Sequence, residues 1–189
     1  LHGTLEQKFR DLDDLHGFVR TVGPSLDLDE LVNTTVTEAS TRLRARRVGL
    51  VVFDETAKGH LAAAGAPLPC MPLAADDIRW SHVFADRAAR QLSPEQLREY
   101  GLNELAAAGD VLVSPLHDGG TVLGLMVLAE RDGAEARFGD ADVNRLSTMT
   151  DQLGPTLRKA MLHEKIEFEA SHDGLTGLPN RKSFERCVD

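Results

Sequence analysis

The side chains best suited to reactive chemistry are two cysteine thiols and one histidine imidazole. Cys70 and Cys187 are the only cysteines and lie far apart in the sequence, so they predict neither a spaced pair of metal ligands nor a disulfide framework. Thiol redox chemistry needs an attacking thiolate with a resolving partner nearby. His82 has no second ligand at a suitable spacing. We therefore predict no catalytic residues and no metal site in this chain.

Ligand binding in a pocket is a second function that the side chains of this chain could support. Residues 66 to 110 combine prolines and scattered aromatic side chains with short helical patterns, and such a long connection inside a compact domain is often a lid or a binding loop. Pocket walls are mostly apolar with a few polar groups. The candidate ligand contacts are Phe53, His60, Cys70, Trp80, His82, Phe84 and Tyr100. Trp80 and Tyr100 are favoured, and core packing is the alternative explanation for each candidate.

The elements that would position such a pocket follow from the hydrophobic pattern. Residues 28 to 43 carry apolar side chains at gaps of three and four, which is typical of an amphipathic helix. Asp27 and Glu30 resemble a capping box at its start. Residues 48 to 53 and 60 to 63 predict a strand hairpin, which would belong to a sheet that covers the apolar face of the helix.

A second hairpin is predicted after the insertion. Its strands would span residues 111 to 116 and 122 to 128, joined by a turn with two glycines. Pro115 indicates a sheet edge or a bulge. Inside the insertion, Ser93 is followed by proline and predicts the cap of a short helix that stops at Gly101.

A long helix is predicted from Asp140, whose carboxylate would cap it. An apolar stripe continues along it at helical spacing from Leu146 to Phe168. Gly154 and Pro155 interrupt the helix, because a proline lacks the N–H that bonds the carbonyl four residues earlier and its ring crowds that group. We predict a kink or hinge there, with a complete break and restart of the helix as the second outcome.

A shorter amphipathic pattern occupies the first 22 residues. Leu5, Leu12 and Val19 lie seven residues apart, and Leu15 and Val22 occupy the second core position of the same heptad. This spacing predicts a coiled-coil seam and a homodimer. A single amphipathic helix lying on its own domain is the alternative.

The charge balance limits the partners. Thirty acidic against 21 basic residues give a net charge of -9, which repels a phosphate backbone and argues against nucleic acid. The arginines of residues 42 to 47 are predicted as the solvated last turn of a helix, in preference to an anion site. No apolar run is long enough to cross a bilayer, and no signal-peptide pattern opens the chain. We therefore expect a cytoplasmic location without membrane contact.

Four short strings in residues 25 to 162 carry a family resemblance. They are the first core helix at 25 to 31, Ser-Pro-Leu at 114 to 116, Val-Leu-Gly at 122 to 124 and Phe-Gly-Asp-Ala-Asp at 138 to 142. Their order and spacing resemble the GAF domain. The resemblance implies an α+β fold, in which an antiparallel sheet has the entry and exit helices on one face and the lid-like helical insertion on the other.

A second motif stands directly after the long helix. It reads Asp173, Gly174, Leu175, Thr176, Gly177, Leu178, Pro179, Asn180 and Arg181. This string resembles the opening turn of GGDEF-type diguanylate cyclase domains. The resemblance implies that Asp173 and Thr176 shape a wide turn and that Asn180 and Arg181 start the first cyclase helix. It also implies GTP and Mg²⁺ for the parent cyclase, whereas this fragment ends before the GGDEF loop and is not expected to be an enzyme.

The GAF resemblance also suggests ligands for the pocket. Some GAF domains ligate haem through a histidine or anchor a linear tetrapyrrole through a cysteine, and His82 and Cys70 are the matching residue types. The cyclic-nucleotide signature of the family is missing around Phe53, and the class that reduces methionine sulfoxide needs clustered cysteines. We predict no cofactor for this fragment, with haem or another small ligand as the less favoured outcome.

These inferences predict four segments. Residues 1–23 would be an N-terminal signalling helix, 24–162 a GAF-like sensory domain, 163–172 a linker helix and 173–189 the truncated start of a GGDEF domain; since the chain begins at Leu1 and stops at Asp189, we expect both ends to be cuts. The predicted function is sensory control of a diguanylate cyclase through a small-molecule ligand, an output helix and a homodimer formed by the N- and C-terminal helices. The alternative is a ligand-free structural dimerisation module of a GGDEF or GGDEF/EAL protein.

Overall fold

The computed structural model describes residues 17–18, 20–54, 59–66, 68, 73–133, 137–173, 176, 178 and 180, with the side chains of residues 60–62 and 108 outside the description. Its centre is an antiparallel sheet, which in the described part has five strands in the order β2-β1-β5-β4-β3. The strands are β1 (Ala45–Phe53), β2 (Gly59–Gly65), β3 (Arg90–Leu92), β4 (Val111–Asp118) and β5 (Thr121–Arg131).

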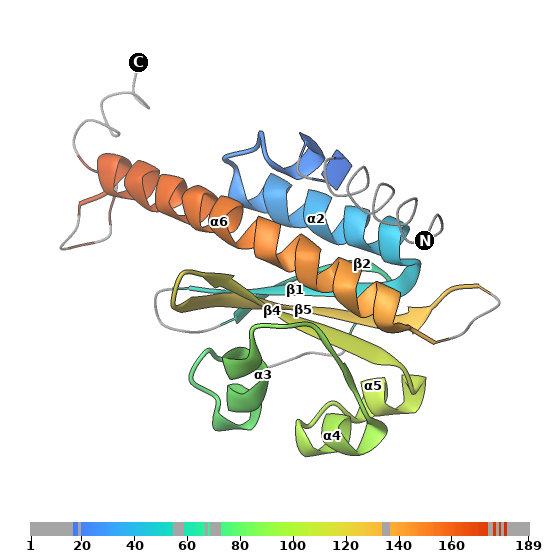
Figure 1. Cartoon of the computed structure of the whole chain (residues 1–189). Helices are drawn as coiled ribbons and strands as arrows, with labels where there is room; N and C mark the ends of the chain where they lie inside the picture. The colour runs from blue at the N-terminus through green and yellow to red at the C-terminus, as the bar shows by residue number, and fades with distance from the viewer. Residues whose placement is uncertain are drawn as a thin grey trace.

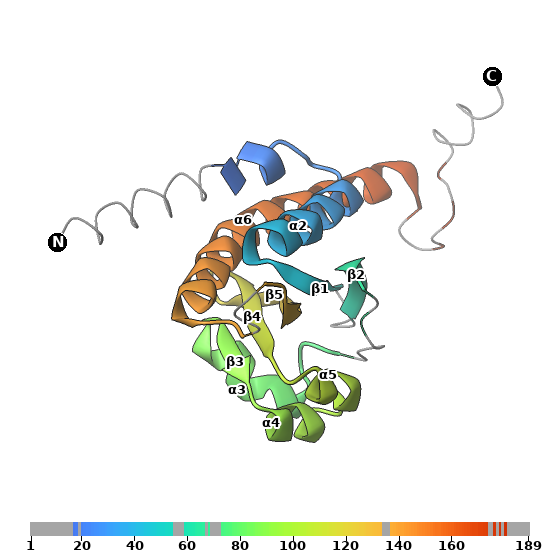
Figure 2. The same cartoon turned by 90° about the vertical axis from the view of Figure 1, so that its right-hand side faces the viewer.

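Helices cover both faces of this sheet (Figures 1 and 2). One face carries α2 (Leu28–Leu43) and α6 (Asp140–Ser171). The other face carries the lid, which we define as residues 73–110 and which contains η1 (Ile78–Trp80), α3 (Ser81–Asp86), α4 (Pro94–Glu99) and α5 (Asn103–Ala108). The predicted α+β architecture and the two predicted hairpins are confirmed.

The first core helix, α2, begins as its sequence predicts. The carboxylate of Asp27 accepts the backbone N–H of Glu30 at 2.8 Å, which satisfies one of the open donors at the helix start. The Glu30 carboxylate accepts the hydroxyl of Ser25 at 2.6 Å. The apolar face of α2 is buried and packs on β1 and β2.

The end of α2 corrects one prediction. Arg44 adopts φ 50° and terminates the helix, and β1 starts at Ala45, three residues before the predicted Val48. Arg46 and Arg47 therefore lie on a strand, so their assignment to the last helical turn is wrong. Arg47 pairs with Glu130 of β5 at 3.0 Å, because neighbouring strands bring these side chains together.

The cap of α6 also differs from the prediction. Gly139 is the N-cap and Asp140 is already the first helical residue, so the predicted Asp140 cap is wrong. Asp142, in the first turn of the helix, accepts the Gly139 N–H at 3.1 Å and forms an ion pair with Arg131 at 2.9 Å. The carboxylate that stabilises the N-terminus therefore comes from the third helical residue, which also fastens the helix to β5.

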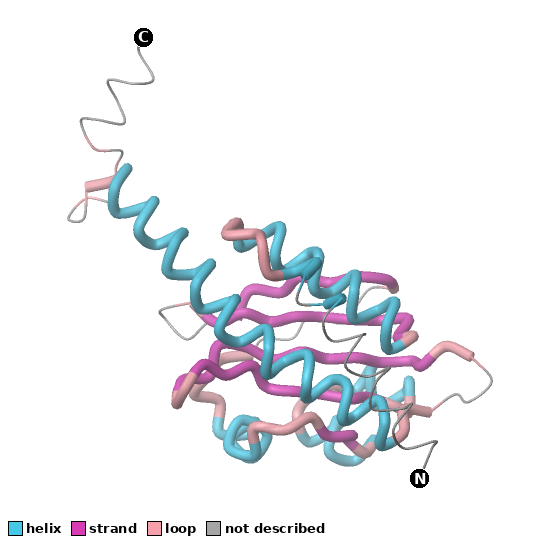
Figure 3. The backbone as a smooth tube through the Cα atoms, turned by 45° about the horizontal axis from the view of Figure 1, so that its top comes forward, coloured by secondary structure: helices cyan, strands magenta, loops and turns pink. Residues whose placement is uncertain are grey.

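The helix α6 continues without interruption through Pro155 (Figure 3). The break and restart is wrong, and the kink or hinge stays a prediction. Pro155 is exposed, so its ring causes no clash with the sheet. Gly154 has a packing role, because a Cβ atom there would lie 1.9 Å from the backbone oxygen of His117 on β4.

The entry helix is described only from Gly17 onward, so most of the predicted coiled-coil seam lies outside the described residues. Phe18 and Val22 are buried in the same core cluster as α2 and α6. Val22 was predicted to belong to the seam. Its burial favours the alternative, in which this end of the helix packs on its own domain.

The strand β4 has an open edge. β3 pairs with only its first part, with Arg90 opposite Val113 and Leu92 opposite Val111. Beyond Val113 this side of β4 has no strand partner within the described ranges, and the register with β5 shifts between Leu116 and His117. Of the two alternatives that Pro115 predicted, the edge is confirmed, which suits a residue that cannot donate a ladder hydrogen bond, whereas the register shift lies beyond Pro115.

We predict that Gly154→Ala destabilises the domain. Alanine favours helices by about 1 kcal/mol over glycine, but the added methyl group would collide with the His117 carbonyl, and such overpacking costs about 1–3 kcal/mol. A net loss of stability in urea unfolding is therefore expected. Gly120→Ala is the control, since a Cβ at this turn meets no atom within 4 Å. A Gly154→Ala variant as stable as the parent would contradict the close contact.

Candidate functional site

The space between the sheet and the lid contains a second core cluster, separate from the one under α2 and α6. Trp80 is 2% exposed and its ring centroid lies 4.5 Å from that of Tyr100. Phe53 of β1 meets Phe84 of α3 edge to face at 5.8 Å. Four of the predicted pocket residues are therefore brought together, and they pack against one another.

This packing limits what the lid can bind in the observed conformation. Buried aromatic pairs of this kind contribute packing energy beyond the area that they bury. A ligand that inserted between Trp80 and Tyr100 would have to separate these two rings. The structure therefore supports the core-packing explanation of these residues more directly than the ligand-contact explanation.

The remaining pocket candidates do not join this cluster. His82 is exposed on α3, and its backbone oxygen accepts from Arg90 at 3.4 Å. His60 lies on β2, where its backbone pairs with Val52, and its side chain lies outside the description. Cys70 and Cys187 lie outside the described residues. In the ranges that the structure describes, no group of three or more His, Cys, Asp or Glu side chains is placed to hold a metal ion.

Asp110 is a buried carboxylate that the sequence analysis did not select. Asp110 lies directly before β4. Its carboxylate accepts one hydrogen bond from the backbone N–H of Phe138 at 2.6 Å and another from the side-chain amide of Gln91 on β3. A buried carboxylate is retained when hydrogen bonds compensate for its lost hydration. Asp110 therefore fastens β3 and the segment before α6 to the start of β4. An acidic residue directly before an apolar strand was the available signal.

His117 is a second polar residue that the sequence did not single out, because its string resembled a hairpin turn, and its side chain is partly buried. Both of its ring nitrogens are buried and have no hydrogen-bond partner among the described residues. Burial lowers the pKa of His117 below its ordinary value, and the positive charge of Arg87 lowers it further. The backbone of Phe84 and the carboxylate of Asp151 act in the opposite direction. Burial and Arg87 together therefore favour the neutral form of the imidazole.

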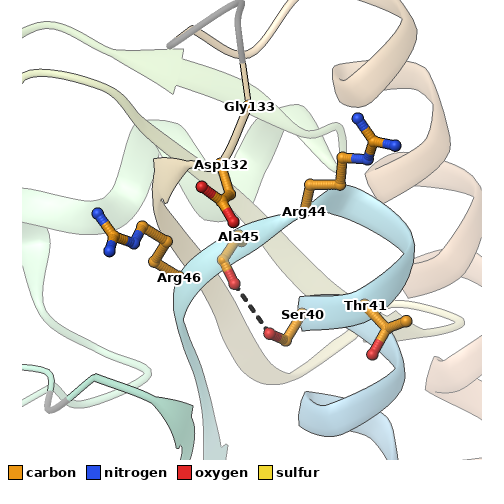
Figure 4. Close-up of a pocket in the computed structure, with 7 residues that line it drawn as sticks. All are labelled: Ser40, Thr41, Arg44, Ala45, Arg46, Asp132 and Gly133. Carbon is orange, nitrogen blue, oxygen red and sulfur yellow. Dashed lines mark hydrogen bonds between the residues drawn. The ribbon is translucent and has the colours of Figure 1, made fainter.

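A surface hollow of about 440 Å³ lies where α2 passes into β1 (Figure 4). The two arginines on its wall, Arg44 and Arg46, direct their guanidinium groups away from each other. The hydroxyl of Ser40 already donates to the carbonyl of Ala45 at 2.8 Å. The hollow lies at the C-terminal end of α2, where the helix dipole is negative. The two guanidinium groups therefore do not point toward a common anion site, and the hollow favours the interpretation of these arginines as solvated surface residues.

The far end of α6 contains the motif that follows the helix. Asn180 returns to the helix end, where its side-chain amide donates to the Ala170 carbonyl at 2.8 Å and its backbone N–H donates to the Ser171 carbonyl at 2.9 Å. These bonds satisfy carbonyls that a helix C-terminus leaves open. Asn180 was predicted to start the next helix, and in the described residues its side chain caps the preceding one.

Hydrogen bonds connect the described residues between the end of α6 and Asn180. The Asp173 carboxylate accepts the backbone N–H of Thr176 at 3.0 Å and its hydroxyl at 2.9 Å. The N–H of Asp173 donates to the carbonyl of Leu178 at 2.7 Å. Asp173 and Thr176 are thus joined by two hydrogen bonds, and their role in a turn that leads into a cyclase domain stays a prediction. Leu175, Gly177 and Arg181 lie outside the described residues.

The last turns of α6 expose apolar side chains. Leu162 is 47% exposed and Ile166 is 63% exposed. The two residues are four apart and share one side of the helix, whereas Leu153, Leu157 and Ala160 are buried on another side. Phe168 is 53% exposed and its ring stacks on His172 at 4.1 Å. None of the described helices is both long and apolar enough to cross a membrane.

Comparison with known proteins agrees with this architecture. A family model for the GAF domain matches residues 27–157. A search of curated proteins found no match. Among solved structures, the GAF domain of a phosphoenolpyruvate-protein phosphotransferase from Acinetobacter superposes with a TM-score of 0.62 at 17% identity, covering 80% of this chain and 94% of that one.

Two further solved structures resemble the chain. The free methionine-R-sulfoxide reductase of Neisseria meningitidis gives a TM-score of 0.64 at 16% identity, covering 81% of this chain and 91% of that one. The GAF-B domain of DevS from Mycobacterium smegmatis gives 0.55 at 23% identity, covering 74% and 99%. At these identities the likeness concerns the fold, since one fold serves many functions.

We predict that Trp80 is a structural residue of the lid. Trp80→Ala should lower the free energy of unfolding by about 3–5 kcal/mol, because it removes a buried indole and leaves a cavity beside Tyr100. Ile78→Ala is the matched control, because Ile78 lies on the same 3₁₀ helix and is 83% exposed. This control should change stability by less than about 0.5 kcal/mol. Equal effects of the two variants in urea unfolding would contradict the packing assignment.

Proposed function

The chain belongs to the GAF domain family, and we propose on that premise that it is the sensory module of a diguanylate cyclase. In this proposal the domain between the entry helix and α6 receives the signal. The segment from Asp173 onward begins the cyclase domain that the signal controls. The cyclase would use GTP and Mg²⁺, which its own residues would bind.

The observation that carries this proposal is the continuity between the domain core and the motif. One helix, α6, packs on β4 through Thr150 and Gly154 and then extends to Ser171. Asn180 caps the end of the same helix with two hydrogen bonds. A shift or rotation of α6 on the sheet would therefore move the turn of the motif with it, since the helix and the turn are joined by bonds at both the backbone and a side chain.

The exposed apolar side of α6 supports a homodimer. Leu162 and Ile166 would meet the same residues of a second copy if the two helices run in parallel. A pair of cyclase domains would then be held side by side. The described part of the entry helix packs on its own domain, so we assign the contact to the end of α6.

A second candidate function is the ligand-free dimerisation module. The packing of Trp80 on Tyr100 and of Phe53 on Phe84 favours it, because these predicted pocket side chains pack against one another. Native mass spectrometry of the purified chain separates the two candidates. Additional bound mass would support a ligand-binding sensor, whereas a dimer without bound mass would support the structural module.

We predict that the natural protein containing this chain makes cyclic di-GMP and that Asn180→Ala changes its rate. The variant loses the amide that caps Ala170, so the helix end should no longer impose its position on the turn, and a rate change of about fivefold or more is expected. Asn144→Ala on the exposed side of α6 is the control and should keep the parent rate. An intact longer protein without any cyclase activity would refute the proposed output.

We predict separately that Ile166→Glu weakens dimerisation. A carboxylate buried in a dimer contact at this position would be desolvated, and the dimer dissociation constant should rise by about tenfold or more. Sedimentation velocity over a concentration series measures this change. Ile78→Glu on the exposed lid helix should leave the constant unaltered. Equal dissociation constants for Ile166→Glu and the parent would place the dimer contact elsewhere.

A further inference from the structure

The sheet separates most of the lid from the helices on its other face, and the two come into contact at the open edge of β4. The segment after α3 reaches around this edge toward α6. The backbone N–H of Ala89 donates to the hydroxyl of Ser147 on α6 at 2.8 Å. This hydrogen bond joins the lid directly to the helix that leads to the motif, without passing through a strand.

His117 lies at the same edge, immediately after the shift in register of β4. Its backbone oxygen faces Gly154 of α6, where a Cβ would approach to 1.9 Å. Its ring nitrogens are buried without a hydrogen-bond partner among the described residues. The charged groups around the ring come from both sides: Arg87 from the lid and Asp151 from α6. The residue opposite on β5, Val122, is apolar.

We propose that this edge, formed by Ala89, Ser147 and His117, is an acid-sensitive latch between the lid and α6. The latch is closed while the buried imidazole is neutral and opens when it gains a proton. Its closed state is the hydrogen bond from Ala89 to Ser147. The use of the latch as a regulatory input rests on the proposed function, but the latch itself is a property of this chain.

The direction of the switch follows from the surroundings of the ring. A proton on His117 would place a charge on a partly buried ring next to the positive charge of Arg87. Asp151 and the backbone of Phe84 offset this cost in part, and the net effect is a pKa below the ordinary value. Opening the edge hydrates the ring and returns its pKa toward about 6.5. The open state therefore binds protons more readily, and acid favours it.

The amide of Ala89 reports directly on the latch, because Ser147 is its hydrogen-bond partner. We would measure its hydrogen-exchange protection factor by NMR in the purified chain, together with the titration of the His117 ring. Protection should fall by about threefold or more between about pH 7.5 and about pH 5.5, because the open state binds the proton more readily than the closed state. The fall should follow the protonation of His117.

Two variants test the assignment. His117→Gln removes the titration and should make Ala89 protection independent of pH, whereas His82→Gln on exposed α3 should behave as the parent does. Protection that is equal at both pH values in the parent, or that falls equally in His117→Gln, overturns the proposal. If His117→Gln does not fold, a mismatch between the His117 titration and the loss of Ala89 protection in the parent overturns it instead. None of these measurements depends on cyclase activity or on the dimer.

Discussion

The close contact between α6 and β4 is the constraint on which the rest of the structure depends. At Gly154 the helix approaches the backbone of His117 so closely that no side chain fits between them. One turn earlier, the buried hydroxyls of Thr150 and Ser114 are 2.7 Å apart. A helix seated on a strand through backbone and short polar groups has one favoured position, because any other would create a clash or leave a buried hydroxyl without a partner. The position of α6 on β4 therefore determines where the C-terminal end of the helix and the motif that follows it lie.

This seating gives the two halves of α6 different roles. The first half completes the core with residues such as Leu146, Leu153 and Leu157. The second half extends past the sheet and exposes Leu162 and Ile166. The helix is uninterrupted between the halves, so under the proposed function a change in packing at the sheet would be transmitted along it as a rigid-body movement. The glycine that permits the close contact and the proline that follows it are therefore placed at the point where such a movement would begin.

Much of the fold could be predicted from the sequence, because the relevant signals are local. The apolar periodicity of α2 and α6, the Asp27 and Ser93 caps and the two hairpins depend on near neighbours in the chain, and the structure contains them. The errors occurred where distant residues compete for the same partner. Asp140 is a suitable cap by type, but the carboxylate that accepts the N–H of the N-cap Gly139 is that of Asp142, which also pairs with Arg131 of β5. The three-residue strand β3 has too short a pattern to be recognised, and forms because β4 offers it an edge.

The sequence by itself determined the family, the layered α+β architecture and the motif after the long helix, because apolar spacing and turn residues specify them locally. It also placed aromatic residues in the lid segment. Only the tertiary structure decided that Trp80, Tyr100, Phe53 and Phe84 pack against one another and that His82 faces solvent. It alone brought Asp110 to Phe138 and His117 under α6. These outcomes depend on the close packing of segments far apart in the chain, where complementary shape and hydrogen-bond partners select among side chains that look equivalent in sequence.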